Sequence, residues 1–187
     1  MNSGSRLITF TGKMGSGKTT AIDCIRRLQR KMILSIKLAQ PLYDIQEYAY
    51  QRIENVYRRP DNFIKDRKLL QFLGTEWGRE GIRDSLWIDI WKDEVNNTLQ
   101  NYTNTLVITD DVRYDNEAKA VHELGGKVIK IESARTDERI NTKNGIVNHP
   151  SEVGVSPYLI TATLKNDGTI DDLEKAILNL HKEIGLW

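Results

Sequence analysis

The residues best suited to chemistry in this chain form an eight-residue segment that begins at Gly12. The segment, Gly-Lys-Met-Gly-Ser-Gly-Lys-Thr, matches the phosphate-binding spacing G-x-x-x-x-G-K-[ST] at every position. Its glycines let successive backbone N–H groups point at one phosphate chain, and the start of a following helix adds its positive dipole end. We therefore predict a nucleoside triphosphate site formed by Gly12, Met14, Gly15, Ser16, Gly17, Lys18, Thr19 and Thr20.

Two side chains of this segment have separate predicted roles. Lys18 would reach the β- and γ-phosphates and act in catalysis, while the Thr19 hydroxyl would bind Mg²⁺. The alternative is a glycine-rich turn with an accidental lysine. The flanking sequence disfavours it, because residues 7–10 read as a buried strand and residues 21–32 as an amphipathic helix.

A second group of candidates follows the apolar run at residues 106–109. In folds built on this loop, a carboxylate at the end of a neighbouring strand completes the magnesium shell or accepts a proton. We predict that Asp110 binds metal and substrate and that Asp111 acts in catalysis. The sequence leaves open which of the two aspartates has which role. The alternative is a plain strand-to-helix turn, in which aspartate is common.

Arg113 follows the two aspartates and is suited to bidentate phosphate binding. We predict that it binds substrate and takes part in catalysis. A surface ion pair between Arg113 and Glu117 is the competing interpretation.

The elements that would position these groups alternate short apolar runs with amphipathic segments, which predicts an α/β fold with a five-stranded parallel sheet flanked by helices. Strands are expected at residues 7–10, 32–36, 106–109, 127–131 and 158–164. Helices are expected near residues 21–32, 42–56, 118–124 and 170–184, with two or more between 66 and 99 that break near Gly74 or residues 78–81. Gly125 and Gly126 would stop one helix, and Thr169 and Asp172 would cap the last.

Residues 133–157 are polar, contain two prolines and show no sustained period, which is typical of a functional lid. Arg135 and Arg139 lie four residues apart near its start. On closure they would bring positive charge to the transferring phosphoryl group, with Arg135 as the catalytic candidate, or they belong to a solvated loop. His149 and Glu152 are candidates for acceptor binding or lid closure, and Glu152 is our substrate-binding prediction.

Composition limits the class of protein. The 187 residues carry 27 Lys and Arg against 26 Asp and Glu, and 39% are hydrophobic. These values predict one domain over residues 1–187 with a real core, and neither a disordered chain nor a fibre. The net charge of +1 argues against stable nucleic-acid binding, which would leave a clearly basic domain.

The single cysteine and the hydropathy pattern indicate in which cellular compartment the protein is expected to work. Cys24 cannot form an internal disulfide or a multi-cysteine metal site, and we expect it to be a small buried side chain in a reducing, cytoplasmic environment. No apolar run approaches the roughly 18 residues that span a bilayer. The first residues lack the pattern of a signal peptide, so no membrane association is expected.

Several blocks together resemble the phage-type deoxynucleoside monophosphate kinases. They are residues 12–19, 38–42, 70–76, Trp87, 110–118 and 149–152, similar in order and spacing from about residue 7 to residue 180. The resemblance implies a P-loop NTPase fold of the nucleoside monophosphate kinase type. It also implies transfer of the γ-phosphoryl group of ATP, with Mg²⁺, to a deoxynucleoside monophosphate (dNMP), which gives ADP and dNDP for DNA precursor supply. Several members are dimeric, so a homodimer is one option, and a phage-encoded enzyme would work in the host cytoplasm.

A kinase must also bind the acceptor phosphate and exclude water. Arg79 and Arg83 follow the Leu-Gly-Thr-Glu block four residues apart, which places them on one face if that segment is helical. They either hold the acceptor phosphate or are solvated helix arginines. Trp77, Trp87 and Trp91 fit a core or an interface, and Trp87 is the candidate for substrate binding because a base needs an aromatic platform.

Other functions fit the same loop. A kinase for dephospho-coenzyme A or a sugar acid uses the same chemistry, a regulatory module would hydrolyse ATP slowly, and a 5′-end kinase would act on nucleic acid. The last needs a basic track, which a +1 chain does not display. The chain lacks an Asn-Lys-x-Asp segment, which weighs against a GTPase, and its size weighs against a motor ATPase. The accepted bases and the selectivity between deoxyribose and ribose are open at this level.

Overall fold

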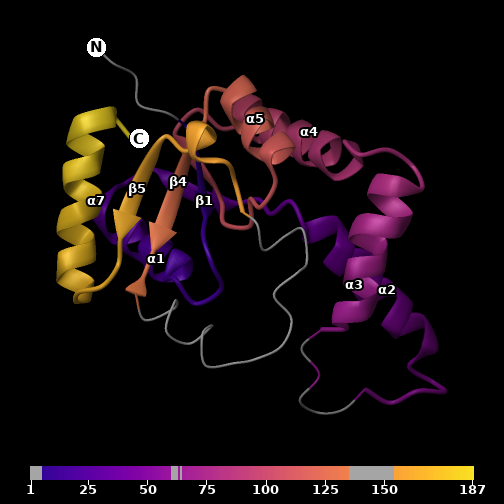
Figure 1. Ribbon diagram of the computed structural model, residues 1–187. Helices are drawn as coiled ribbons and strands as arrows, with labels where there is room; N and C mark the ends of the chain where they lie inside the picture. The colour runs from indigo at the N-terminus through magenta and orange to yellow at the C-terminus, as the bar shows by residue number, and fades with distance from the viewer. Residues whose placement is uncertain (1–5, 60–62, 64, 135–153) are drawn as a thin grey trace.

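Five strands form one parallel sheet in the order β2-β3-β1-β4-β5 (Figure 1). This computed structural model describes residues 6–59, 63, 65–134 and 154–187. Within them the strands are β1 (Leu7–Thr11), β2 (Met32–Ser35), β3 (Thr105–Thr109), β4 (Lys127–Glu132) and β5 (Ala162–Lys165). The predicted five-stranded parallel sheet flanked by helices is confirmed.

The centre of the sheet is buried on both faces. Every residue of β1 and β3 is buried, as expected for parallel strands that are covered by helices on each side. The two strands pair in register, with Leu7 opposite Val107 and Thr9 opposite Thr109. Because the carboxyl ends of parallel strands lie at the same end of the sheet, which we call its carboxyl edge, the residues that follow β1 and β3 lie side by side.

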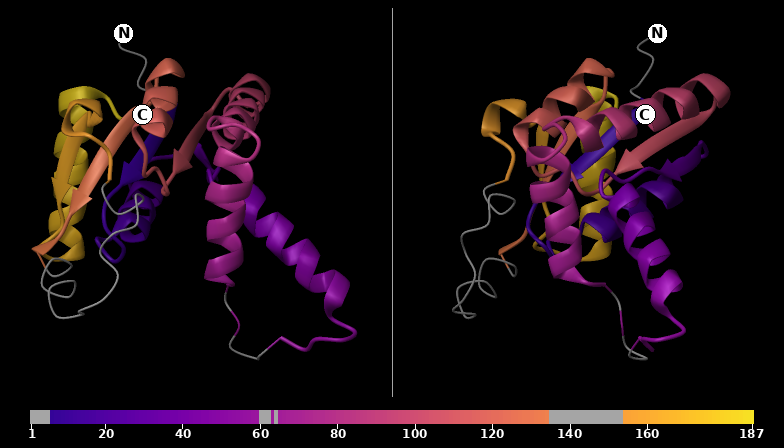
Figure 2. Two further views of the ribbon diagram at one scale, coloured as in Figure 1. Left: turned by 45° about the vertical axis from the view of Figure 1, so that its right-hand side comes forward. Right: turned by 90° about the vertical axis from the view of Figure 1, so that its right-hand side faces the viewer.

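Helices cover both faces of the sheet (Figures 1 and 2). On one face α1 (Lys18–Leu28) packs with α7 (Ile170–Ile184) around a cluster that includes Phe10 and Ile177. On the other face α4 (Leu86–Asn101) and α5 (Asp115–Glu123) pack around a cluster that includes Trp91 and Val121. The predicted capping residues of α7 are confirmed, since the Thr169 hydroxyl accepts from Asp172 N and the Asp172 carboxylate accepts from Thr169 N.

Three helical segments project beyond the sheet as an arm (Figure 2). They are α2 (Gln40–Ile53), α3 (Arg67–Phe72) and the π-helix η1 (Leu73–Glu80). The Asp66 carboxylate caps α3 by accepting from Leu69 N at 3.0 Å, and the Tyr50 hydroxyl of α2 donates to the same carboxylate at 2.9 Å. A shared hydrogen-bonded carboxylate thus fixes α2 against α3.

The helix break and the last strand differ in detail from the prediction. Helix α3 continues through Gly74 into η1, and the break falls after η1 at Gly81, the second of the two predicted places. The expected strand at residues 158–164 is wrong over its first half. Pro157–Leu159 forms a 3₁₀ turn, η3, because Pro157 cannot donate to a ladder, and β5 begins at Ala162.

Cys24 is fully buried on α1, as predicted. The α1 helix ends at Leu28 rather than near residue 32, because Met32 already pairs with Thr105 in the sheet. Helix α5 ends at Glu123, with Leu124 as its C-cap. Gly125 follows with a φ of 70°, which confirms the predicted glycine stop. In the part of the chain that the structure describes, no helix has the length and apolar character needed to cross a bilayer.

A buried chain of hydrogen bonds joins α4 to the carboxyl edge of the sheet. Trp91 Nε1 donates to Thr109 Oγ1 at 3.1 Å, and the Thr109 hydroxyl donates to the Ile36 carbonyl at 2.7 Å. These contacts connect α4, the end of β3 and the chain that leaves β2. They fix the backbone immediately before Asp110.

We expect Trp91→Phe to lower the free energy of unfolding by about 1–3 kcal/mol, because it removes the indole donor and leaves a small cavity. Urea unfolding followed by circular dichroism measures the change. Trp77→Phe is the control, since Trp77 is 42% exposed and its loss should cost about 0.5 kcal/mol or less. Equal losses in the two variants would contradict this account of Trp91.

Candidate active site

The phosphate-binding loop lies between the end of β1 and the start of α1. Gly12, Gly15 and Gly17 have φ values of 135°, 85° and 99°, a region that side-chain-bearing residues rarely adopt. A Cβ on Gly12 would lie 2.4 Å from the Ile131 carbonyl oxygen, so this position also excludes a side chain by contact. The glycines of the motif are therefore required by the backbone of the loop itself.

Lys18 is the first residue of α1 and arches back over the loop. Its Nζ donates to the Gly12 carbonyl at 2.8 Å and to the Lys13 carbonyl at 3.0 Å. The first turn of α1 has no acidic residue of its own to offset the positive end of the helix dipole. Met14 lies 79% exposed on the loop, whereas Ser16 is buried with an Oγ that has no hydrogen-bond partner among the described residues. This arrangement suits an anion.

Asp110 and Asp111 occupy different environments at the end of β3. Asp111 accepts from Leu38 N and Ala39 N, each at 3.0 Å, so both of its oxygens are used at the start of α2. Burial raises the pKa of Asp111, and these two N–H groups oppose the rise. The Asp110 Oδ1 is a buried atom with no hydrogen-bond partner in the described chain, and it lies 3.7 Å from Lys37 Nζ. The sequence did not distinguish these two carboxylates, but the geometry does.

Arg113 follows on the same loop with an exposed side chain that forms no ion pair among the described residues. Its backbone N–H donates to Glu117 Oε2 at 2.7 Å, and Tyr114 N donates to the same oxygen at 3.1 Å. The surface ion pair between Arg113 and Glu117 is therefore not formed. Glu117 instead holds the backbone that carries Arg113.

The charged partner of Glu117 is Arg79, from η1. Arg79 Nη2 donates to Glu117 Oε1 at 2.6 Å, and the two side chains are only 12% and 6% exposed. The Arg79 guanidinium also lies over the Tyr114 ring, 4.4 Å from its centroid. Burial raises the pKa of Glu117, while the Arg113 amide and the positive charge of Arg79 oppose the rise. The pair joins the arm to the loop that follows β3.

Arg83 does not share a helix face with Arg79, because the helical condition for that prediction is not met at Arg83. The π-helix ends at Glu80, so Arg83 lies in the connection to α4. Its guanidinium pairs with Asp89 at 2.9 Å and its side chain is 59% exposed. The solvated interpretation therefore fits Arg83, whereas Arg79 is neither solvated nor open to a ligand.

The core interpretation of the tryptophans is confirmed for Trp87 and Trp91, which are 4% and 1% exposed. Trp87 Nε1 donates to the Gly74 carbonyl at 3.1 Å, and a Cβ on Gly78 would meet the same nitrogen at 2.4 Å. The Trp87 ring is thus packed into the arm and offers no open platform to a base, which corrects its predicted substrate contact. Trp77 is partly exposed and lies 6.1 Å from Trp87 between ring centroids.

Sequence reasoning missed two lysines near Arg113. Lys37 is the ion-pair partner of Asp110 and directly follows the apolar run that became β2. Burial lowers the pKa of Lys65, and repulsion from Arg67, Arg113 and Lys37 lowers it further. We call Lys37, Lys65, Arg67 and Arg113 the cationic cluster. Lys37 could have been found as the first charged residue at the end of a parallel strand, but no periodic signal pointed to Lys65.

Most of the predicted lid lies outside the described residues, including Arg135, Arg139, His149 and Glu152. The described chain on either side is anchored. Ala134 N donates to Asp167 Oδ1 at 2.7 Å, and the Ser156 amide and hydroxyl donate to the Asp115 carboxylate at 2.8 and 2.6 Å. Ser156 therefore lies against the first residue of α5, beside the loop that carries Arg113.

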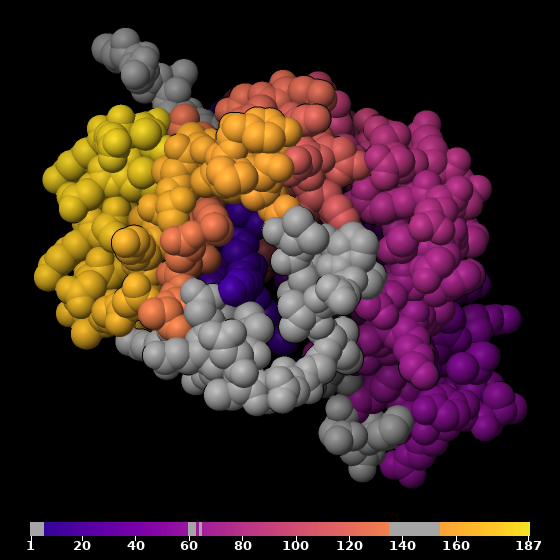
Figure 3. Space-filling model, viewed as in Figure 1, coloured from indigo at the N-terminus to yellow at the C-terminus, as the bar shows by residue number. Residues whose placement is uncertain are grey.

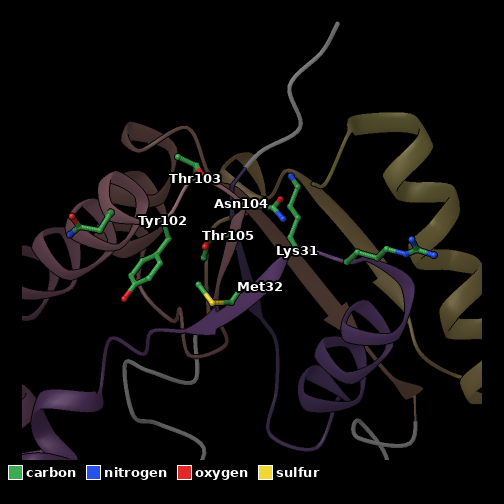
Figure 4. A pocket seen from close by; sticks show the side chains of 8 residues that line it. Lys31, Met32, Tyr102, Thr103, Asn104 and Thr105 are labelled. Carbon is green, nitrogen blue, oxygen red and sulfur yellow. The ribbon is translucent and has the colours of Figure 1, made fainter.

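Figure 3 shows indigo atoms of the N-terminal part of the chain between the orange strand side of the molecule and the magenta helices of the arm. A separate cavity of about 540 Å³ lies at the other edge of the sheet, where β2 and β3 begin (Figure 4). It is lined by Arg30, Lys31, Met32 and residues 101–105, none of which belongs to the candidate site. The candidate residues instead follow the carboxyl ends of β1 and β3, at the opposite end of the strands.

Comparison with known proteins agrees with this geometry. The family model described as deoxynucleotide monophosphate kinase matches residues 60–177, more than half of the chain. A putative deoxynucleotide monophosphate kinase of Acanthamoeba polyphaga mimivirus is 27% identical over 194 residues, which cover 92% of this chain and 94% of the relative. The deoxynucleoside-5′-monophosphate kinase of Escherichia phage T5 is 31% identical over 122 residues, and the match covers 63% of this chain and 46% of that protein.

The fold is that of P-loop kinases. Dephospho-CoA kinase from Campylobacter jejuni superposes with a TM-score of 0.52 over 96% of each chain, at 17% sequence identity. Identity at this level establishes the shared fold alone. The superposition confirms the P-loop architecture that the sequence predicted.

We expect Arg79→Met to lower the free energy of unfolding by about 3–5 kcal/mol, because it leaves a buried carboxylate without its partner. Arg79→Met combined with Glu117→Gln should recover part of the loss, since the uncompensated charge is then gone. Chemical denaturation of the unaltered protein, Arg79→Met, Glu117→Gln and the double variant measures both effects. If the losses in the free energy of unfolding caused by the two single substitutions simply add in the double variant, the proposed coupling between Arg79 and Glu117 is contradicted.

The same variant has a predicted pH dependence. Burial already raises the pKa of Glu117, and removal of Arg79 raises it more, so the folded variant binds a proton more readily than the unfolded chain. Its stability deficit should therefore shrink as the pH falls through the raised pKa of Glu117. Arg26→Met is the control, because the Arg26–Asp23 pair is about half exposed and should contribute about 1 kcal/mol or less at any pH.

Proposed function

Because the chain belongs to the deoxynucleotide monophosphate kinase family and is a phosphotransferase, we propose that it transfers the γ-phosphoryl group of ATP to a deoxynucleoside monophosphate. The products are ADP and a dNDP, a precursor of DNA synthesis. One observation carries the proposal. The phosphate loop after β1 and the loop with Asp110 and Arg113 after β3 leave adjacent parallel strands at the same edge.

The donor triphosphate binds on the phosphate loop. Lys18 exchanges its two carbonyl partners for β- and γ-phosphate oxygens, which are stronger acceptors for an ammonium group. Backbone N–H groups of the loop and the start of α1 supply the remaining positive potential. The family supports use of a nucleotide donor, and we assign that donor as ATP.

Thr19 and Asp110 are the residues that would hold Mg²⁺. The ion prefers hard oxygen ligands, and Asp110 Oδ1 is a buried carboxylate oxygen that lacks a hydrogen-bond partner in the described chain. The residues present therefore fit a magnesium ion. When bound, the ion neutralises charge on the β- and γ-phosphates.

We assign Asp111 to positioning rather than to proton transfer. Both of its oxygens accept backbone N–H groups, so the carboxylate fixes the start of α2 beside the site. The chemistry does not require it as a base, because a monophosphate oxygen is already ionised at neutral pH. Catalysis by this chain then consists of alignment and charge neutralisation.

The acceptor phosphate binds at the cationic cluster. An anion there relieves the repulsion that lowers the pKa of Lys65, and Arg113 offers an exposed, planar pair of donors. Arg79 acts indirectly, since its buried pair with Glu117 holds the backbone of Arg113. Arg135 and Glu152 remain predicted lid residues of the single domain. The proposed substrates are cytoplasmic metabolites, and the reaction needs neither a membrane nor nucleic acid.

A kinase for dephospho-coenzyme A is the second candidate, because that enzyme has the same fold. It uses a hydroxyl group as acceptor and needs a base, whereas a dNMP does not. The engagement of both Asp111 oxygens by backbone amides therefore favours the monophosphate acceptor.

A coupled ADP-release assay with ATP and Mg²⁺ tests the proposal against a panel of dNMPs, NMPs, dephospho-coenzyme A and oligonucleotide 5′ ends. We expect release that depends on a dNMP. Lys18→Ala should reduce turnover by about 10³-fold or more, because it removes the charge that aligns the transferring group. Unchanged circular dichroism in Lys18→Ala excludes unfolding as the cause. Near-normal turnover in that variant, or release only with another acceptor, would refute the proposal.

We expect Arg113→Ala to raise the KM for the dNMP about 10- to 100-fold with a much smaller change in the KM for ATP, because a charge-assisted phosphate contact is lost on the acceptor side. Steady-state kinetics with each substrate varied in turn separates the two constants. Arg26→Ala removes the same charge from the outer face of α1 and should leave both unchanged. A rise confined to the KM for ATP would place Arg113 at the donor instead.

A further inference from the structure

We propose that Asn166 is a positioning residue for the phosphate-binding loop, which it holds in the conformation that accepts a polyphosphate. The proposal rests on the proposed function, in that the loop binds the donor triphosphate. Asn166 lies 150 positions from the residue that it contacts, and no motif in the sequence marks it.

Asn166 joins the loop to the rest of the sheet. It directly follows β5, and its backbone N–H donates to the Glu132 carbonyl at the end of β4 at 2.8 Å. Its side-chain Nδ2 donates to the Ser16 carbonyl at 2.9 Å. The side chain is partly buried. Asn166 is thus fixed by β4 at one end and fixes the loop at the other.

The bond to Ser16 sets the orientation of a whole peptide unit. In a trans peptide the C=O and the following N–H point in opposite directions. With the Ser16 carbonyl turned toward Asn166, the N–H of Gly17 is directed away from Asn166. Backbone N–H groups in this part of the motif are the donors that bind phosphate oxygens, so the Asn166 amide determines where one of them points.

Gly17 and Asn166 are also matched in shape. A Cβ on Gly17 would lie 2.1 Å from Asn166 Nδ2, so the carboxamide occupies the space that a side chain would need. Gly17 has a φ of 99°, which permits this close approach. Neighbouring Ser16 is 1% exposed. The asparagine therefore supports the loop by a hydrogen bond and by contact.

A direct contact between Asn166 and the donor base is the competing role for a residue beside the loop. The two roles differ in which ligands they affect. A base contact affects only ligands that carry a base, whereas loop positioning affects any polyphosphate. Inorganic tripolyphosphate has no base and therefore distinguishes them.

Isothermal titration with Mg²⁺-tripolyphosphate and with Mg²⁺-ATP tests the proposal on the full chain. The variants are Asn166→Ala and Asn166→Asp. Asn166→Asp keeps the side-chain shape but replaces the donor with a negative charge that faces the Ser16 carbonyl. Asn179→Ala is the matched control, because Asn179 lies on the exposed side of α7. Thermal unfolding without ligand reports on the fold of each variant.

We expect Kd for tripolyphosphate and for ATP to rise by the same factor, about three- to tenfold in Asn166→Ala and more in Asn166→Asp. The KM for the dNMP and the Kd values of Asn179→Ala should not change. Weaker binding of ATP with unchanged tripolyphosphate binding would overturn the proposal in favour of a base contact. Unchanged Kd values in both variants, or unfolding of both, would also overturn it. Failure of the unaltered protein to bind either ligand would refute the proposed function itself.

Discussion

The parallel pairing of β1 with β3 is the constraint on which the candidate site depends. A phosphate loop and an acidic strand end come from positions about 100 residues apart in the chain, and only a sheet that runs both strands in one direction brings them to one edge. The strands are buried on both faces, so a slip in register by one residue would move every side chain of the strand into the packing of the opposite face. The packing energy of the core is therefore also what aligns the loop with Asp110.

Carboxylates that bind backbone amides fix the parts of the molecule that the sheet does not. Asp111 holds the start of α2, Asp66 the start of α3, and Asp115 the chain at Ser156. Glu117 accepts two amides of the loop after β3 and the guanidinium of Arg79. These groups satisfy N–H donors that would otherwise be buried without partners. Asp110 differs from them, because its Oδ1 has no hydrogen-bond partner among the described residues, and this is why we assign the proposed metal to it.

The sequence predicted the sheet, the phosphate loop and the acidic strand end because each has a local signature. Apolar runs mark the buried strands, and the loop needs glycines at fixed positions. It could not assign Arg79, because the spacing to Arg83 was read with an α-helical period, whereas η1 is a π-helix that ends between them. It could not separate Asp110 from Asp111, because their difference depends on the amides of Leu38 and Ala39, which only the fold brings near.

Charge distribution connects the near-neutral sequence with a site for two phosphate-bearing substrates. The net charge is +1, yet burial lowers the pKa of Lys65, and repulsion from Arg67, Arg113 and Lys37 lowers it further. Lys37 pairs with Asp110, and cations elsewhere also form ion pairs, as Arg27 does with Glu174 and Lys92 with Glu123. A phosphate bound at the proposed acceptor site would reduce this repulsion. Since a ligand that relieves repulsion in the folded state binds more tightly by that amount, the repulsion among these cations would add to the binding energy of the proposed acceptor.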